Sequence, residues 1–93
     1  MVDTTADERL KVRDGAAVWR EIEGETVLLG IDSSMYMGLN RTGTELWPLL
    51  VEGTTQRALT EHLVERFGID EQRASDDVAA FVDSCRTRHL LEG

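Results

Sequence analysis

Apolar and polar residues alternate along the first part of the chain, and apolar residues recur at helical spacing along the rest. Alternation is typical of half-buried strands, whereas spacings of three and four residues are typical of amphipathic helices. The pattern therefore predicts an α+β fold, in which a three-stranded antiparallel sheet is followed by three helices. The expected strands cover residues 16–22, 25–31 and 35–39, and the expected helices cover 43–52, 56–67 and 71–89.

Turn and cap residues support these boundaries. Glu23-Gly24 fits a two-residue hairpin turn between the first two strands. Thr42 and Glu45 match a capping box, which favours Thr42 as the first helix cap. Proline is tolerated only near the first turns of a helix, and a start after Thr42 places Pro48 closer to the beginning of the helix than a start after Asn40 does. Thr42 is therefore the preferred cap. The other expected caps and stops are Gly53, Thr54 or Thr55, Gly68 and Asp70.

No linker or internal repeat interrupts this order. Residues 1–8 are polar and are expected to form a flexible N-terminus. Residues 9–93 are expected to form one domain, with Leu10 and Val12 in a short extended lead-in. The predicted order of strands and helices is that of a small winged helix-turn-helix domain.

Both faces of the predicted hairpin carry apolar side chains. If the two-residue turn holds, Trp19 lies opposite Leu28 and Val18 lies opposite Leu29. One face packs on the helices, and the other requires a partner. One hypothesis is therefore a small scaffold subunit that binds an enzyme through an exposed Trp19/Leu28 face.

Composition narrows the functional classes. The chain has 93 residues and a formal net charge of −8, which disfavours nucleic acid and anionic membranes and favours neutral, apolar or basic partners. No apolar run is long enough to span a membrane, and the polar N-terminus lacks the apolar segment of a signal peptide. A single cysteine excludes an internal disulfide. We expect a cytoplasmic protein.

In a DNA-binding domain of this order, the third helix would read the bases. Its first turns offer only Gln72 and Arg73 to base edges. Its acidic residues are Asp70, Glu71, Asp76, Asp77 and Asp83. These carboxylates would repel a phosphate backbone, so an acidic DNA-binding regulator is an alternative that the charge disfavours.

The sequence shows no constellation typical of an enzyme. It lacks a phosphate-binding glycine loop. Cys85 and His89, at positions i and i+4 of the third predicted helix, could supply only half of a structural zinc site. A small buried thiol is the ordinary interpretation of Cys85 in an apolar stripe. We expect no catalytic residues, no metal and no cofactor.

Residues 35–39, Met-Tyr-Met-Gly-Leu, form the most informative segment. As the last strand of the sheet they lie at an edge, where backbone N–H and C=O groups are unpaired. Edges are usually protected by charge or proline, and this one has neither. Packing of Met35, Met37 and Leu39 on the core explains the side chains. Addition of an extended peptide as a further strand would also use the backbone, and the two interpretations are compatible.

The order of these features resembles the PqqD-like family of RiPP recognition elements, which bind the leader peptides of ribosomally made, modified peptides. The resemblance extends over about residues 9–92. The matching runs are Trp19, Val27-Leu28-Leu29, Met37-Gly38-Leu39-Asn40, Gly53-Thr54-Thr55, Phe67, Asp77-Val78, Phe81-Val82 and Leu90-Leu91.

In that family the fold is a winged helix-turn-helix without catalytic residues, and the leader adds a strand in a groove beside the third helix. The resemblance implies a peptide site at Met35, Tyr36, Met37 and Gly38, with Asp77, Phe81 and Ser84 across the groove. The sequence does not decide which flank of the helix faces the strand.

The resemblance also implies partner enzymes and the kind of leader peptide, the guest, that the groove would bind. A freestanding chain of this size resembles the version that delivers a lasso-peptide precursor to a leader peptidase and a cyclase, and the freestanding form of the quinone-cofactor pathway. The acidic balance favours a leader bearing Lys or Arg. An apolar anchor of the leader is expected between Tyr36 and Phe81, with Asp77 at the rim.

Overall fold

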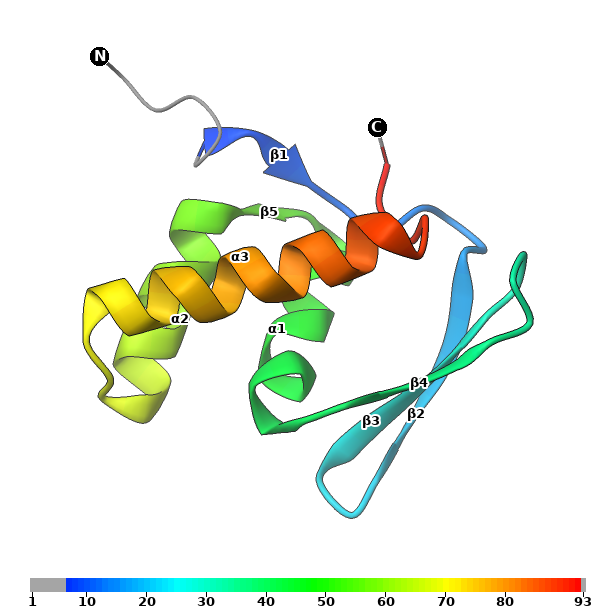
Figure 1. Cartoon of the computed structure of the whole chain (residues 1–93), viewed down its shortest axis with the longest axis horizontal. Coiled ribbons are helices and arrows are strands. Elements are labelled where there is room, and N and C mark those ends of the chain that lie inside the picture. Colours follow the sequence, from blue (N-terminus) through cyan, green and yellow to red (C-terminus); the bar gives the residue numbers. More distant parts are fainter. Residues whose placement is uncertain (1–6, 93) are drawn as a thin grey trace.

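The structure, a computed structural model, describes residues 7–92. The strands are β1 (Arg9–Leu10), β2 (Ala17–Ile22), β3 (Glu25–Gly30), β4 (Tyr36–Leu39) and β5 (Thr54–Thr55), and the helices are α1 (Arg41–Glu52), α2 (Gln56–Phe67) and α3 (Glu71–Thr87). The antiparallel sheet has the order β2-β3-β4, and the helices gather to one side of it (Figure 1). The α+β fold expected from the sequence is confirmed.

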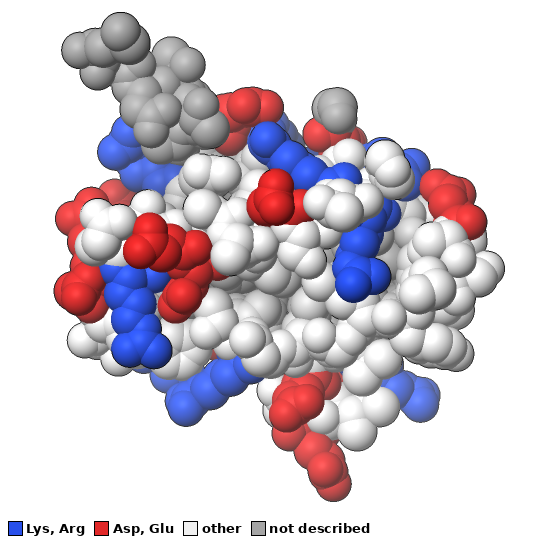
Figure 2. Space-filling view, viewed as in Figure 1, with Lys and Arg blue, Asp and Glu red and all other residues white. Residues whose placement is uncertain are grey.

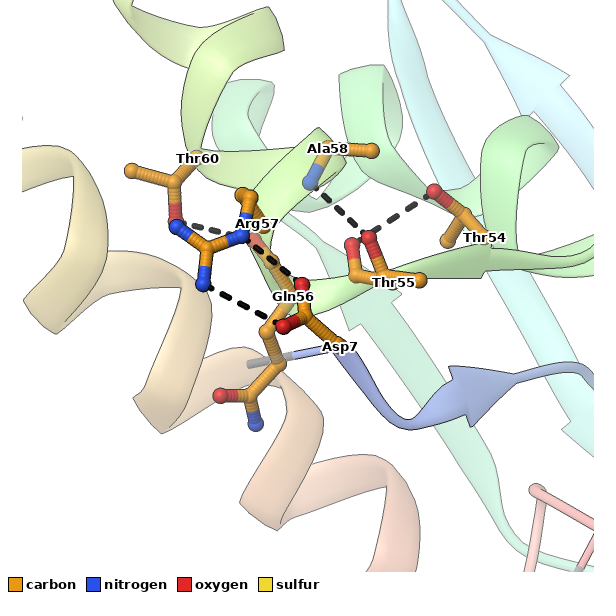
Figure 3. A network of polar contacts seen from close by, with 7 residues as sticks. All are labelled: Asp7, Thr54, Thr55, Gln56, Arg57, Ala58 and Thr60. Carbon is orange, nitrogen blue, oxygen red and sulfur yellow. Dashed lines mark hydrogen bonds and ion pairs between the residues drawn. The ribbon is translucent and has the colours of Figure 1, made fainter. Parts of the chain in front are cut away.

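The N-terminal lead-in is extended, as expected, but it also has a partner that the hydrophobic pattern did not indicate. β1 pairs with β5, the two-residue strand between α1 and α2. Just before β1, the Arg57 guanidinium donates to the Asp7 carboxylate at 2.8 Å, beside the Thr55 cap of α2 (Figure 3). Most of the expected flexible N-terminus lies outside the described residues.

The hairpin register is confirmed. Glu23 and Gly24 both have positive φ, 51° and 81°, between the paired residues Ile22 and Glu25. Such a pair of left-handed residues matches the twist of the flanking strands. The turn sets Trp19 opposite Leu28 and Val18 opposite Leu29.

The inner face of the sheet carries Trp19 and Leu28. Leu28 is 1% exposed, and the Trp19 ring meets the buried Trp47 ring of α1 edge-on, with centroids 5.4 Å apart. Leu28 is therefore covered and cannot contribute to an exposed Trp19/Leu28 docking face, whereas the Trp19 side chain remains 46% exposed. The outer face instead leaves Val18 55% and Tyr36 73% exposed.

Helix α1 begins earlier than the sequence analysis expected. Asn40 is its N-cap, and the Asn40 side chain accepts from the Gly43 N–H at 2.9 Å. The early start places the Thr44 hydroxyl where it accepts from the Thr26 N–H at 2.9 Å. Pro48 therefore lies inside the helix, where it has no N–H to donate to the Thr44 C=O.

Helix α3 ends sooner than its apolar stripe suggested. Arg88 is the C-cap, and His89 leaves the helix with a φ of 58°. The chain turns back there because Leu90 and Leu91 pack into the core. Cys85 and His89 therefore do not share a helix face.

The remaining caps agree with the sequence analysis. Thr55 and Asp70 accept from backbone N–H groups at the starts of α2 and α3, and Gly53 and Gly68 end α1 and α2. Gly68 has a φ of 65°, a left-handed conformation that glycine adopts without strain.

Candidate peptide-binding groove

The backbone of β4 presents unpaired polar groups on the side away from β3. The Gly30 N–H donates to the Met35 C=O at 3.0 Å, which fixes the alternation of the β3–β4 ladder. In this alternation Met37 directs its N–H and C=O toward β3, whereas Tyr36 and Gly38 direct theirs outward. A guest strand would therefore pair with Tyr36 and Gly38.

Gly38 leaves the middle of this edge clear. A Cβ built on Gly38 would meet no atom within 4 Å. The absence of a side chain lets another backbone approach closely. The residues of β4, Tyr36–Leu39, also carry neither the charge nor the proline that would oppose an added strand.

Two hollows lie along the line between β4 and α3. The hollow at the beginning of β4 is lined by Leu28, Gly30, Ser33, Met35, Met37, Arg88 and Leu90. The hollow at the end of β4 is lined by Asn40, Thr42, Gly43, Arg73, Asp77, Ala80 and Phe81. We call the two hollows and the β4 edge between them the β4–α3 groove. The surface between α3 and the sheet is largely uncharged, with acidic and basic side chains around it (Figure 2).

The structure decides which flank of α3 faces the groove. Asp77, Phe81 and Arg88 line the hollows, and their spacing places them along one side of the helix. Ser84 falls between Phe81 and Arg88 on the same flank and is half-buried. The structure thus brings the three α3 residues named in the sequence analysis to the side that borders β4.

The structure separates Tyr36 from Phe81. Tyr36 pairs with Leu29 and points to the outer face of the sheet, since side chains alternate along a strand. Phe81 packs on the inner side, where a Cβ on Gly43 would lie 3.1 Å from its ring. An anchor held between Tyr36 and Phe81 therefore cannot form, because the sheet lies between them.

Sequence reasoning missed two arginines of the groove, Arg73 and Arg88. The sequence indicated Arg73 only as a DNA contact. Arg88 continues the spacing of Asp77, Phe81 and Ser84, which is the signal that could have identified it. Both arginines lie in a segment whose charge pattern is dominated by acidic residues.

The described residues offer little for chemistry other than binding. Cys85 is buried, and desolvation raises the pKa of its thiol to about 12, so the thiol stays protonated. Within residues 7–92 no three His, Cys, Asp or Glu side chains gather in a way that could hold a metal ion. No helix in the same range is both long and apolar enough to cross a membrane.

Comparison with known proteins places the chain in a family. The family model described as "Coenzyme PQQ synthesis protein D (PqqD)" matches residues 25–91, which include the sheet from β3 onward and all three helices. The chain belongs to the PqqD family. No functionally curated protein matches it.

Two solved structures are similar to this member of the PqqD family. The structure described as "TbiB1 in Complex with the TbiA(beta) Leader Peptide" matches with a TM-score of 0.80 and 30% identity, over 89% of this chain and 95% of that chain. "Lasso peptide synthetase B1 complexed with the leader peptide" matches with a TM-score of 0.76 and 21% identity, over 90% and 98%. Because the second structure is only 21% identical, that match shows a similar fold alone.

Proposed function

We propose that this protein is a non-catalytic RiPP recognition element that binds the leader segment of a precursor peptide as an added strand on β4. The outward-facing backbone groups of Tyr36 and Gly38, beside a largely uncharged groove, carry this proposal. Membership of the PqqD family and the leader-bound state of TbiB1 support it.

A guest strand in this position would expose alternate side chains to two environments. Those directed inward would meet the groove at Met37 and Phe81, and at Ser84 by its spacing along α3. Those directed outward would lie next to Tyr36 on the outer face. The backbone would supply affinity, and the inward side chains would supply selectivity.

The outer face of the sheet would serve the second part of the function, delivery of the leader to an enzyme. Val18, Ile22 and Tyr36 are large apolar side chains at least half exposed there. Exposed apolar side chains gathered on one face mark an interaction surface. A leader peptidase or cyclase that contacts this face would lie next to the bound guest, at the β4 edge.

Backbone hydrogen exchange tests strand addition directly. The probe is the synthetic leader of the precursor encoded nearest to this protein's gene, with the TbiA(beta) leader as a second probe. We expect the amide protons of Tyr36 and Gly38 to become protected on binding, while that of Met37 changes little because it already pairs with β3. Protection confined to another edge or to α3 would contradict the proposal.

Duplex DNA provides the control for the alternative function. At physiological salt we expect no mobility shift at micromolar protein and no displacement of the leader by DNA. Nonspecific DNA binding by basic domains reaches a Kd of about 10⁻⁴ to 10⁻⁶ M, and the acidic residues of α3 oppose it. A salt-sensitive shift, together with unprotected β4 amides, would favour the DNA-binding regulator.

A further inference from the structure

We propose that the guest carries an acidic side chain and that Arg88 binds it at the beginning of β4. This inference rests on the proposed function, since it concerns the same groove. It adds an acidic residue to the expectation that the acidic balance of the chain favours a leader bearing Lys or Arg.

The first observation is the position of Arg88. Arg88 lines the hollow at the beginning of β4 together with Met35, Met37 and Leu90. The other lining side chains are apolar except that of Ser33, whose hydroxyl accepts from the Met35 N–H, and the hollow is shallow, with a volume of about 10 Å³. The Arg88 guanidinium beside these apolar side chains suits a guest whose own apolar side chain lies across them, next to a carboxylate.

The second observation is that neighbouring arginines are paired and Arg88 is not. Arg86 lies 3.6 Å from the Glu8 carboxylate, and Arg13 donates to Asp32 at 3.1 Å. Within residues 7–92, Arg88 forms no side-chain hydrogen bond or ion pair with any residue. Its charge is therefore available to a carboxylate from outside the chain.

The third observation is the charge of the groove compared with that of the protein. Two arginines, Arg73 and Arg88, and one aspartate, Asp77, line the two hollows. The lining of the two hollows thus holds one more basic than acidic side chain, in a chain of net charge −8. An acidic guest residue would be repelled by most of the surface and attracted here, so the charge would also help set the register of the guest.

The two ends of the groove differ in a way that gives the guest a direction. Among the described residues, Arg88 is the one charged side chain lining the hollow at the beginning of β4, whereas the hollow at its end holds both Arg73 and Asp77, whose charges offset each other. A guest antiparallel to β4, the arrangement of the rest of the sheet, would carry its acidic residue on the C-terminal side of its apolar residues.

Peptide selection tests the assignment with random sequences, so the natural leader need not be identified first. A display library of random short peptides is selected on the wild-type protein and on Arg88→Glu, with Arg86→Glu as the matched control. Arg86 lies in the last turn of α3 but borders a different hollow, with Glu8 and Glu92. Only peptides that fail to bind the Gly38→Pro variant are compared, because their binding depends on the β4 edge.

The expected result is an exchange of charge at one peptide position. Wild type and Arg86→Glu enrich Asp or Glu there, and Arg88→Glu enriches Lys or Arg at the same position. For the best wild-type peptide, we expect Arg88→Gln to weaken binding about three- to tenfold and Arg86→Gln to leave it within about twofold.

The outcomes separate this inference from the proposed function. If β4-dependent binders are selected but their charge pattern is the same on wild type and Arg88→Glu, the Arg88 inference is wrong and strand addition stands. If no binder depends on Gly38, strand addition itself is wrong. Circular dichroism verifies that each variant is folded, and Arg88→Gln replaces Arg88→Glu if the charge reversal disturbs the end of α3.

Discussion

The sheet has two edges, and only one of them is suited to a guest. On β2 the Ile31 N–H donates to the Ala16 C=O at 2.9 Å, so by alternation Trp19 and Glu21 direct their backbone groups outward. Tyr36 and Gly38 do the same on β4. Unpaired backbone groups therefore do not distinguish the two edges.

The surroundings of the edges do distinguish them. β2 carries exposed charges at Arg20 and Glu21, which protect an edge against strand addition. β4 has no charged residue, and the hollows along α3 include Met35 and Met37 but no residue of β2. We infer from this difference that the groove beside α3, rather than the edge alone, would direct a guest strand to β4.

The largest expected difference comes from proline placed on each edge. Gly38→Pro removes an outward N–H and fills the clear space at the centre of β4, so we expect at least about thirtyfold weaker leader binding, about 2 kcal/mol. Glu21→Pro removes an outward N–H from β2 and should leave the affinity unchanged. Isothermal titration with the leader measures both.

Gly38→Ala is the control for this pair, since it keeps the N–H and its Cβ has space. We expect Gly38→Ala to bind within about threefold of wild type. Met37→Pro is a poorer probe than Gly38→Pro, because the Met37 N–H faces β3 and its loss would weaken the sheet itself. Equal loss of binding in Gly38→Pro and Glu21→Pro would show that the two edges do not differ in function.

The sequence was sufficient for features that neighbouring residues determine. The Glu23-Gly24 turn, the Thr55 and Asp70 caps and the Gly68 stop follow from local conformational preference. The same local preferences were enough to set the hairpin register, and with it the inner face of the sheet. The edge position of β4 then followed from the order of the strands.

Features that depend on distant contacts were missed. α1 starts after Asn40, and the Thr44 hydroxyl of its first turn accepts from the Thr26 N–H, eighteen positions away along the chain. α3 ends at Thr87 because the last residues must reach the core. The groove residue Arg88 and the outward direction of Gly38 follow from the same long-range geometry, which hydrophobic periodicity does not contain.

A smaller difference is expected between two exposed apolar residues of the outer face. Tyr36→Ala should weaken leader binding about three- to tenfold, because the ring lies at the β4 edge beside the guest and contributes roughly 0.5–1.5 kcal/mol. Val18→Ala, on β2, should leave affinity unchanged. Fluorescence anisotropy with a labelled leader compares them, and an equal loss in both would place the guest across the outer face instead of along β4.

Thermal unfolding separates binding from stability in this comparison. Tyr36 is 73% exposed, so Tyr36→Ala should change the free energy of unfolding by less than about 0.5 kcal/mol. Phe81 packs against the core, so Phe81→Ala should lower the free energy of unfolding by more than Tyr36→Ala does. Phe81→Ala is therefore a poor probe of guest binding.

The smallest expected effect concerns the rim charge at the end of β4. Asp77 is half-buried beside Phe81, and by spacing Asp83 lies on another side of α3. Asp77→Asn should weaken binding of a leader with a basic residue by about twofold, within the range of roughly 0.2–1 kcal/mol for exposed ion pairs. The effect should disappear near molar salt, where the screening length falls to about 3 Å. Asp83→Asn should have no effect at either salt concentration. An Asp77 effect larger than that of Tyr36→Ala, or one that persists in high salt, would mean that charge rather than the edge backbone and the apolar groove selects the guest.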